Sequence, residues 1–269
     1  LGHSPFGHVG EDIISQELDH NFDHNIQSFR QVTLLEKKYV SYDGLNLSWE
    51  TLDGLIKHNG PIQDPIHEYN LSPEFSFNLN KYPSLEAQIA SISDDIAYIA
   101  HDFDDGIRSE ILSLKKLSKN NILFEFIDFD YLFSLDDKVA RNYFTRQVIN
   151  YLVLNLIKET ELKLKNSNLK SYDDIINSSE FYVRFSANIQ EKVNLMKSYL
   201  FEHFYTSDFV YNNRTHAEKI LVFIINFLKE NISELPPSWQ KKITDEQSKK
   251  QTIVDYVCGM TDQYAINFY

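Results

Sequence analysis

Residues 84–108 read SLEAQIASISDDIAYIAHDFDDGIR, and this stretch decides the fold. Apolar side chains recur in it at intervals of three and four residues, which is the spacing of one face of an α-helix. Ser84 is of the residue type that caps a helix N-terminus. Gly106, near the other end, is expected to bend the helix or to mark a close contact. The apolar series that predicts this helix comprises Leu85, Ile89, Ile92, Ile96 and Ile99.

Helical patterns extend over most of the remaining chain. Residues 64–83, rich in Pro, Asn and Ser, predict a loop, whereas the aromatic residues 124–133 fit either a strand or a buried helix. The 8 glycines and 7 prolines are few for a many-turned β architecture. We therefore predict an all-α fold. Its further helices are expected at 48–58, 135–165, 190–204, 213–231 and from about residue 244.

The composition excludes several classes of protein. With 42% hydrophobic residues, the 269-residue chain can bury a core and is not a disordered chain. The single Cys258 excludes an internal disulfide framework and a cysteine-rich zinc site, and it is typical of a reducing compartment. The apolar run 220–225 is too short to span a bilayer. We expect a cytoplasmic protein with no membrane partner.

The net charge of −13 is unevenly distributed along the chain. Residues 1–112 hold 19 acidic and 6 basic side chains, whereas residues 113–269 hold 20 of each. No basic stripe offsets the acidic excess, which argues against nucleic acid as the main partner. Clustered carboxylates are hard oxygen ligands and indicate a bound cation. The alternative interpretation is a solvated acidic face that keeps the protein soluble.

The opening segment LGHSPFGHVGE, residues 1–11, combines two imidazoles and a carboxylate with glycines and a proline. Imidazole exchanges a proton near neutral pH, which suits acid–base chemistry. Glu11 follows His8 by three residues, so one helical turn would place them side by side. A carboxylate in that position would hold the tautomer of the imidazole. The alternative is an N-terminal loop whose histidines have no chemical role.

Two further groups share a helical spacing. His20 and His24, four residues apart, would face one side of a helix and bind a metal there, or else form a polar surface. Asp94, Tyr98 and Asp102 would line one face of the long helix. A solvated face explains the two carboxylates of this group, but it does not favour a tyrosine between them.

Four stretches of the chain carry a family resemblance: LGHSPFGHVGE (1–11), FDHNIQSFR (22–30), GLNLSWETLDGLIKHNGP (44–61) and the helical stretch 84–108. They resemble the HD-domain deoxynucleoside triphosphate triphosphohydrolases, specifically the bacterial deoxyguanosine triphosphate triphosphohydrolase-like proteins. GMTDQYA, residues 259–265, resembles the closing motif of that family. The resemblance implies an HD-domain helical fold. Residues 1–115 would be the remainder of the HD catalytic core, and residues 116–269 a helical C-terminal part packed on it rather than an independent domain.

The resemblance also implies an activity, the metal-dependent hydrolysis of a deoxynucleoside triphosphate to deoxynucleoside and tripolyphosphate. The metal would be Mg²⁺ or Mn²⁺. The implied roles are catalysis by His8 and Glu11, substrate binding by His3, His24, Tyr98 and Asp102, and metal ligation by Asp94. The other family ligands, a His and a His-Asp doublet, are expected upstream of Leu1, which is not a methionine. The turn at residues 58–60 receives no role.

Two further expectations accompany this assignment. Cationic groups must offset the charge of a triphosphate, and Arg30, Lys57 and Arg108 are candidates together with residues of another subunit. A homo-oligomer with an even number of subunits is expected from the resemblance. Two other functions stay open. One is a catalytically inactive fragment that acts as a nucleotide-binding or oligomerising remnant, and the other is an HD phosphohydrolase that acts on nucleotide monophosphates.

Overall fold

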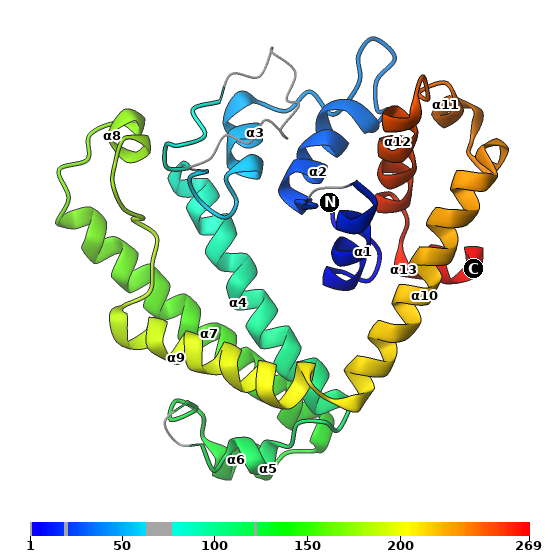
Figure 1. Ribbon diagram of the computed structural model, residues 1–269. Helices are drawn as coiled ribbons and strands as arrows, with labels where there is room; N and C mark the ends of the chain where they lie inside the picture. The colour runs from blue at the N-terminus through cyan, green and yellow to red at the C-terminus, as the bar shows by residue number, and fades with distance from the viewer. Residues whose placement is uncertain (1, 19–20, 63–76, 121–122) are drawn as a thin grey trace. The chain divides into compact units, whose positions relative to one another are not determined.

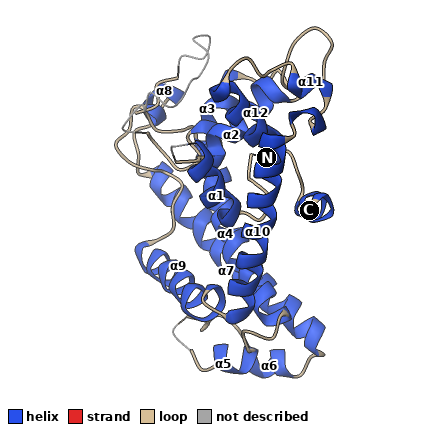
Figure 2. Cartoon of the chain, turned by 45° about the vertical axis from the view of Figure 1, so that its right-hand side comes forward, coloured by secondary structure: helices blue, strands red, loops and turns tan. Residues whose placement is uncertain are grey.

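The computed structural model describes residues 2–18, 21–62, 77–120 and 123–269, and every regular element in these ranges is a helix (Figures 1 and 2). One isolated bridge joins Lys37 to Gly44. The prediction of an all-α protein is confirmed, and the architecture is consistent with an HD-domain helical fold. Within the same ranges, no helix combines the length and the apolar character needed to cross a membrane.

The chain divides into two compact units, and both ends of the chain contribute to the first. Unit 1 holds the described residues of Leu1–Ile56 and Tyr211–Tyr269, and unit 2 those of Lys57–Ile66 and Ser72–Val210. The predicted division near residue 115 between a catalytic core and a C-terminal part stays a prediction. The helices of the first part of the chain are α1 (His8–Leu18), α2 (His24–Arg30), the π-helix η1 (Gln31–Leu35), α3 (Trp49–Ile56) and α4 (Leu85–Arg108). Those that follow are α5 (Leu114–Leu117), α6 (Phe129–Phe133), α7 (Asp137–Lys165), α8 (Tyr172–Ile176), α9 (Ala187–Leu200), the π-helix η2 (Phe201–Tyr205), α10 (Asp208–Glu230), the 3₁₀-helix η3 (Ile232–Glu234), α11 (Pro237–Gln240), α12 (Glu246–Cys258) and α13 (Asp262–Phe268).

Unit 2 is organised around α4, which packs against α7 and α9. Ser84 caps α4 as predicted, because its hydroxyl accepts a hydrogen bond from the Ala87 N–H at 3.2 Å. Phe103 lies at the centre of the core, edge-on to Phe124 at 5.4 Å and to Phe144 at 5.9 Å between ring centroids. The inward face of α4 therefore fixes the position of its opposite face, which carries Asp94 and Tyr98.

Unit 1 is a small bundle whose core joins the two chain ends. Ile14 of α1 is buried among apolar residues of α10 and α12, including Ile224 and Val257. Two ion pairs reinforce this contact at the surface, Arg214 with Asp12 at 2.7 Å and Lys229 with Glu17. Helix α1 is thus held on the C-terminal segment, although more than half of the chain separates the two in sequence.

The predicted helices are confirmed with small shifts at their ends. The helix expected at 135–165 is α7, that at 190–204 is α9 followed by η2, and that at 213–231 is α10. The last predicted helix is α12, which Asp245 caps, and a break at residues 259–261 separates it from α13. Of the helix ends, that of α10 is followed by Pro236 and Pro237, as the sequence predicts.

Other expectations are resolved in different ways. Ile89 of the predicted apolar face is 48% exposed, and the buried residue at this turn of α4 is Gln88. The aromatic segment 124–133 is neither a strand nor one helix, since only α6 is regular and Phe124 is buried before it. Gly106 marks a close contact, because a Cβ there would lie 2.5 Å from the Leu112 Cδ1 atom. Of the predicted loop 64–83, residues 64–76 lie outside the described residues.

A buried carboxylate ties α2 to α12 in unit 1. Asp255, 3% exposed, accepts hydrogen bonds from Arg30 through Nε at 3.1 Å and through Nη2 at 2.5 Å. Gln27 Nε2 at 3.1 Å and Gln251 Nε2 at 2.9 Å donate to the same carboxylate. A buried carboxylate without partners would be costly, because it loses its hydration in a medium of low dielectric constant. The bidentate ion pair with Arg30 and the two amide donors compensate the Asp255 carboxylate for this loss.

We expect Asp255→Asn to destabilise the protein by about 3 kcal/mol, because the variant leaves the Arg30 guanidinium without its counter-charge in a mostly buried site. The measurement is the free energy of unfolding in urea. The control is Asp43→Asn, which breaks an exposed ion pair with Lys37 and should change stability by less than about 0.5 kcal/mol. Equal effects of the two substitutions would show that the buried pair does not hold the unit together.

Candidate active site

The first turn of α1 carries two of the predicted catalytic residues. The helix begins at His8, and the Glu11 N–H donates to the Gly7 carbonyl oxygen at 3.1 Å. His8 Nδ1 lies 3.7 Å from Glu11 Oε2, which confirms that one helical turn places the two side chains side by side. The imidazole of His8 is 76% exposed and is open to a ligand.

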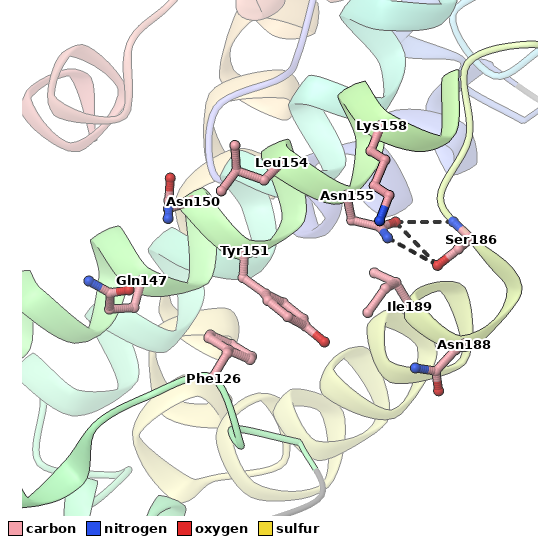
Figure 3. Close-up of a pocket in the computed structure, with 10 residues that line it drawn as sticks. All are labelled: Phe126, Gln147, Asn150, Tyr151, Leu154, Asn155, Lys158, Ser186, Asn188 and Ile189. Carbon is pink, nitrogen blue, oxygen red and sulfur yellow. Dashed lines mark hydrogen bonds between the residues drawn. The ribbon is translucent and has the colours of Figure 1, made fainter. Parts of the chain in front are cut away.

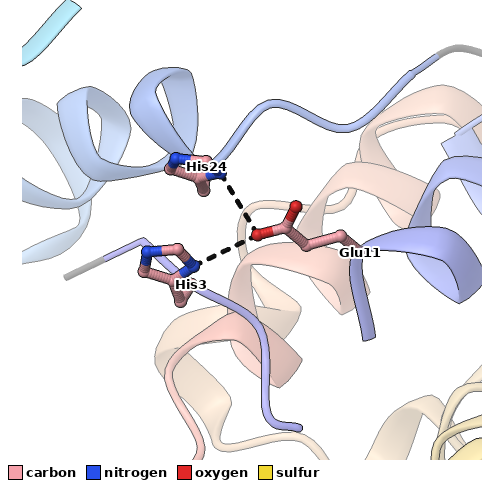
Figure 4. Close-up of side chains that lie close together, drawn as sticks. All are labelled: His3, Glu11 and His24. Atoms are coloured by element: carbon pink, nitrogen blue, oxygen red, sulfur yellow. Dashed lines mark hydrogen bonds and ion pairs between the residues drawn. The ribbon is translucent and has the colours of Figure 1, made fainter. Parts of the chain in front are cut away.

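The Glu11 carboxylate also contacts two further imidazoles, those of His3 and His24, as Figure 4 shows. Its Oε1 atom lies 3.1 Å from His3 Nδ1 and 3.2 Å from His24 Nδ1. The rings of His3 and His24 stack on each other with centroids 4.4 Å apart. We call His3, His8, Glu11 and His24 the imidazole cluster. Four predicted site residues are therefore neighbours in unit 1, and they come from the loop before α1, from α1 and from the start of α2.

Two glycines allow these segments to approach so closely. A Cβ on Gly2 would lie 2.2 Å from Ser28 Oγ and 2.6 Å from the His24 carbonyl oxygen. A Cβ on Gly10 would lie 2.2 Å from the Pro5 carbonyl oxygen. Only glycine fits at such distances. The glycine-rich character of the opening segment thus has a steric cause, since it brings the His3 loop onto α1 and α2.

The cluster keeps the Glu11 carboxylate ionised. Burial on its own would raise the pKa of Glu11, but the hydrogen bond and charge of His24, the hydrogen bond of His3 and the charge of His8 lower this pKa to about 2. The ionised carboxylate orients the Nδ1 atoms of His3 and His24 toward itself. It therefore favours the tautomer with the proton on Nδ1 in each ring.

The same residues meet the geometric requirement for a metal. The ligand atoms of His3, Glu11 and His24 all lie within 4.8 Å of one another. Two imidazole nitrogens and one carboxylate oxygen are a common ligand set for transition metals. The predicted metal pair of His20 with His24 is not tested, because His20 lies outside the described residues. In the described part of the chain, His24 faces His3 and Glu11.

Unit 2 holds the second predicted group, with one residue that the sequence did not indicate. The Tyr205 hydroxyl is hydrogen-bonded to the Asp102 carboxylate and lies 2.5 Å from the Tyr98 hydroxyl. Burial raises the pKa of Asp102, and burial with the Asp102 hydrogen bond raises the pKa of Tyr205. Tyr205 lies 103 residues from Asp102, so no helical spacing could have revealed it.

Asp94 is one turn before Tyr98 on α4, with its carboxylate 74% exposed. His58 Nε2 lies 3.5 Å from Asp94 Oδ2. His58 belongs to the turn at residues 58–60, to which the sequence assigned no role. The structure now gives it one contact, with the carboxylate that the family resemblance identifies as a metal ligand.

The cations proposed to neutralise a triphosphate have other partners in the chain. Arg30 is bonded to the buried Asp255, and Arg108 Nη2 lies 2.5 Å from Asp105 Oδ1. Lys57 is buried. In these positions none of the three presents an uncommitted charge. The imidazoles of the imidazole cluster are therefore better candidates for binding an anion.

A pocket of about 410 Å³ lies in unit 2 beside α7 and the start of α9 (Figure 3). Tyr151 forms its wall and stacks on Phe126 at 3.9 Å between ring centroids. The Asn155 side chain is bonded to Ser186 through both the backbone N–H and the hydroxyl. The lining includes none of the predicted site residues, and we assign no role to this pocket.

The depressed pKa of Glu11 makes stability dependent on pH in a defined window. The carboxylate stabilises the fold above its unfolded pKa of about 4.3, and this contribution is lost as the pH falls through the folded value of about 2. We therefore expect Glu11→Gln to be less stable than the parent at pH 5, with a difference that shrinks toward pH 2.5. Urea unfolding at several pH values measures it. A difference that is constant from pH 5 to 2.5 would contradict the proposed ion cluster.

Comparison with known proteins identifies the family. The family model of the phosphohydrolase-associated domain matches residues 183–269. Over 282 aligned residues the chain is 37% identical to a deoxyguanosinetriphosphate triphosphohydrolase-like protein of Brucella anthropi, covering 99% of this chain and 70% of that protein. Proteins of the same name from Bartonella quintana and Rickettsia typhi are 37% and 36% identical, with 100% of this chain aligned to 71% and 72% of theirs. The chain therefore belongs to the family of deoxyguanosinetriphosphate triphosphohydrolase-like proteins.

Proposed function

We propose that the protein hydrolyses deoxynucleoside triphosphates, dGTP among them, to deoxynucleoside and tripolyphosphate with the help of a divalent metal. The observation that carries the proposal is the ionised Glu11 carboxylate surrounded by three imidazoles. Such a group can hold a polyanion and can supply a proton within one site. The names of the relatives support the substrate class.

In the proposed reaction, water attacks the α-phosphorus, and the bond from this phosphorus to the deoxynucleoside oxygen breaks. The leaving oxygen needs a proton, and His8, the most exposed of the three imidazoles, would donate it. Glu11 would orient His8. The distance of 3.7 Å between Glu11 Oε2 and His8 Nδ1 would shorten when substrate binds, because catalytic hydrogen bonds are often long in the absence of substrate. His3 and His24 would contact the phosphates.

Asp94 would hold the metal, Mg²⁺ or Mn²⁺. Its exposed carboxylate is a hard oxygen ligand, and the His58 imidazole at 3.5 Å is placed to orient it, so the donor chemistry fits. When bound, a divalent metal neutralises phosphate charge and lowers the pKa of a coordinated water. The resemblance implies further metal ligands in addition to Asp94.

Tyr98 and Asp102 would bind the deoxyribose. The phenol ring of Tyr98 offers an apolar face to the sugar, and the Asp102 carboxylate can accept a hydrogen bond from a sugar hydroxyl. Tyr205 holds both groups in place through its hydroxyl. A partly buried carboxylate that already has one donor is a selective acceptor rather than a solvated charge.

Two variants separate the metal ligand from the proton donor. We expect Asp94→Ala to abolish both metal binding and turnover, because the site loses a charged ligand. His8→Ala should keep the metal but lower turnover by roughly 10²- to 10⁴-fold, the usual range for a lost general acid. The assay is release of tripolyphosphate from each dNTP by the protein with Mg²⁺ or Mn²⁺, alongside metal content by elemental analysis.

Matched controls lie beside each substitution. Asp95→Ala, next to Asp94 on α4, breaks an ion pair with Lys197, and His216→Ala removes an exposed imidazole of α10. Both should leave turnover within about twofold. Near-normal turnover in His8→Ala, or retained metal in Asp94→Ala, would refute the assigned roles.

Release of inorganic phosphate from nucleotide monophosphates would favour the alternative phosphohydrolase, and binding without turnover would favour the inactive remnant. The homo-oligomer with an even number of subunits stays a prediction.

A further inference from the structure

The closing motif GMTDQYA, residues 259–265, has no part in the chemistry described above, yet it contacts the opening segment. Thr261 caps α13 by accepting a hydrogen bond from the Tyr264 N–H at 3.1 Å. Asp262, the first residue of that helix, accepts a hydrogen bond from the Phe6 N–H, with Oδ1 at 2.9 Å. The two residues are 256 positions apart in sequence. We propose that Asp262 is a positioning residue that holds His3 in the imidazole cluster, acting through the backbone of residues 3–7.

The backbone at Phe6 adopts a conformation that needs external support. Its φ of 63° lies in the left-handed region, which side chains other than glycine rarely adopt, and Gly7 follows at 56°. Inside the loop, two hydrogen bonds join Ser4 and Gly7. The Gly7 N–H donates to the Ser4 carbonyl oxygen, and the Ser4 hydroxyl donates to the Gly7 carbonyl oxygen. These bonds leave the Phe6 N–H without an acceptor in the loop. The Asp262 carboxylate supplies this acceptor, and the Phe6 ring packs on the core of unit 1.

We expect a movement at Phe6 to reach His3 because the two intervening residues, Ser4 and Pro5, are both buried. Pro5 restricts the backbone before Phe6, and the Pro5 carbonyl oxygen lies against Gly10. On the other side of His3, Gly2 lies against the backbone of His24. The Glu11 contact of His3 at 3.1 Å and its stacking on His24 therefore depend on how the loop is held at Phe6.

Other ties between the chain ends act elsewhere. The pairs Arg214 with Asp12 and Lys229 with Glu17 hold the body of α1, not the loop before it. Asp262 is exposed, so its removal leaves the apolar core of unit 1 complete. A loss of loop order in an Asp262 variant can thus be distinguished from a loss of fold.

The test compares Asp262→Ala with Asp262→Asn, whose side-chain carbonyl can still accept the Phe6 hydrogen bond. Lys229→Met is the matched control, since it breaks another contact between the two chain ends, one that joins α10 to α1 away from the loop. Hydrogen exchange of the Phe6 amide and the NMR resonances of the His3 imidazole need no substrate. In Asp262→Ala we expect the exchange rate of the Phe6 amide to rise at least about tenfold and the His3 resonances to shift. The exchange rates of the α12 amides should not change, and the melting temperature should stay within about 3 °C of the parent value.

Asp262→Asn should restore both signals, and Lys229→Met should alter neither. The proposal is overturned if Asp262→Ala leaves Phe6 and His3 unchanged, if Asp262→Asn is as defective as Asp262→Ala, or if protection is lost throughout α12. The consequence for catalysis rests on the proposed function, in which His3 contacts substrate. There, Asp262→Ala should lower turnover about tenfold or more and Asp262→Asn should recover it. The two proposals can fail separately. If the protein has no triphosphohydrolase activity but the His3 resonances still shift in Asp262→Ala, the proposed function is refuted and the positioning role of Asp262 stands.

Discussion

The bidentate bond between Arg30 and the buried Asp255 is the interaction on which unit 1 depends. Helix α2 has only seven residues, too few to be stable as an isolated helix in water. Its position comes from tertiary contacts, and Asp255 accepts two of the polar ones, from Arg30 and Gln27. His24 is the first residue of this helix. The orientation of one imidazole therefore follows from a carboxylate in the segment that the phosphohydrolase-associated domain covers.

A similar dependence explains why a single carboxylate can organise three imidazoles. Glu11 meets His8 by local helical geometry, which any sequence with this spacing would produce. Its contacts with His3 and His24 are different, because they require a loop and a second helix to be placed by the rest of unit 1. The low pKa of Glu11 is the electrostatic result of this convergence, since burial on its own would have the opposite effect.

The sequence predicted what local spacing determines and missed what tertiary structure determines. Helix α4, its cap at Ser84 and the pairing of His8 with Glu11 follow from periods of three and four residues. Tyr205 next to Asp102, and His58 next to Asp94, join residues from distant parts of unit 2 and leave no periodic signal. The proximity of His3 and His24 to Glu11 was accessible only through the family resemblance, which gave them roles in the same reaction.

The two units differ in the chemistry that they present. The imidazole cluster of unit 1 offers N–H donors, which suit a chain of phosphates. The group of Tyr98, Asp102 and Tyr205 in unit 2 is phenolic and acidic, and it suits a sugar with its hydroxyls. A deoxynucleoside triphosphate combines these two chemical parts across the bond that is proposed to break. Each group, as described, matches one of these parts, since the imidazole N–H donors suit the polyanion and the phenolic and carboxylate oxygens suit the sugar hydroxyls.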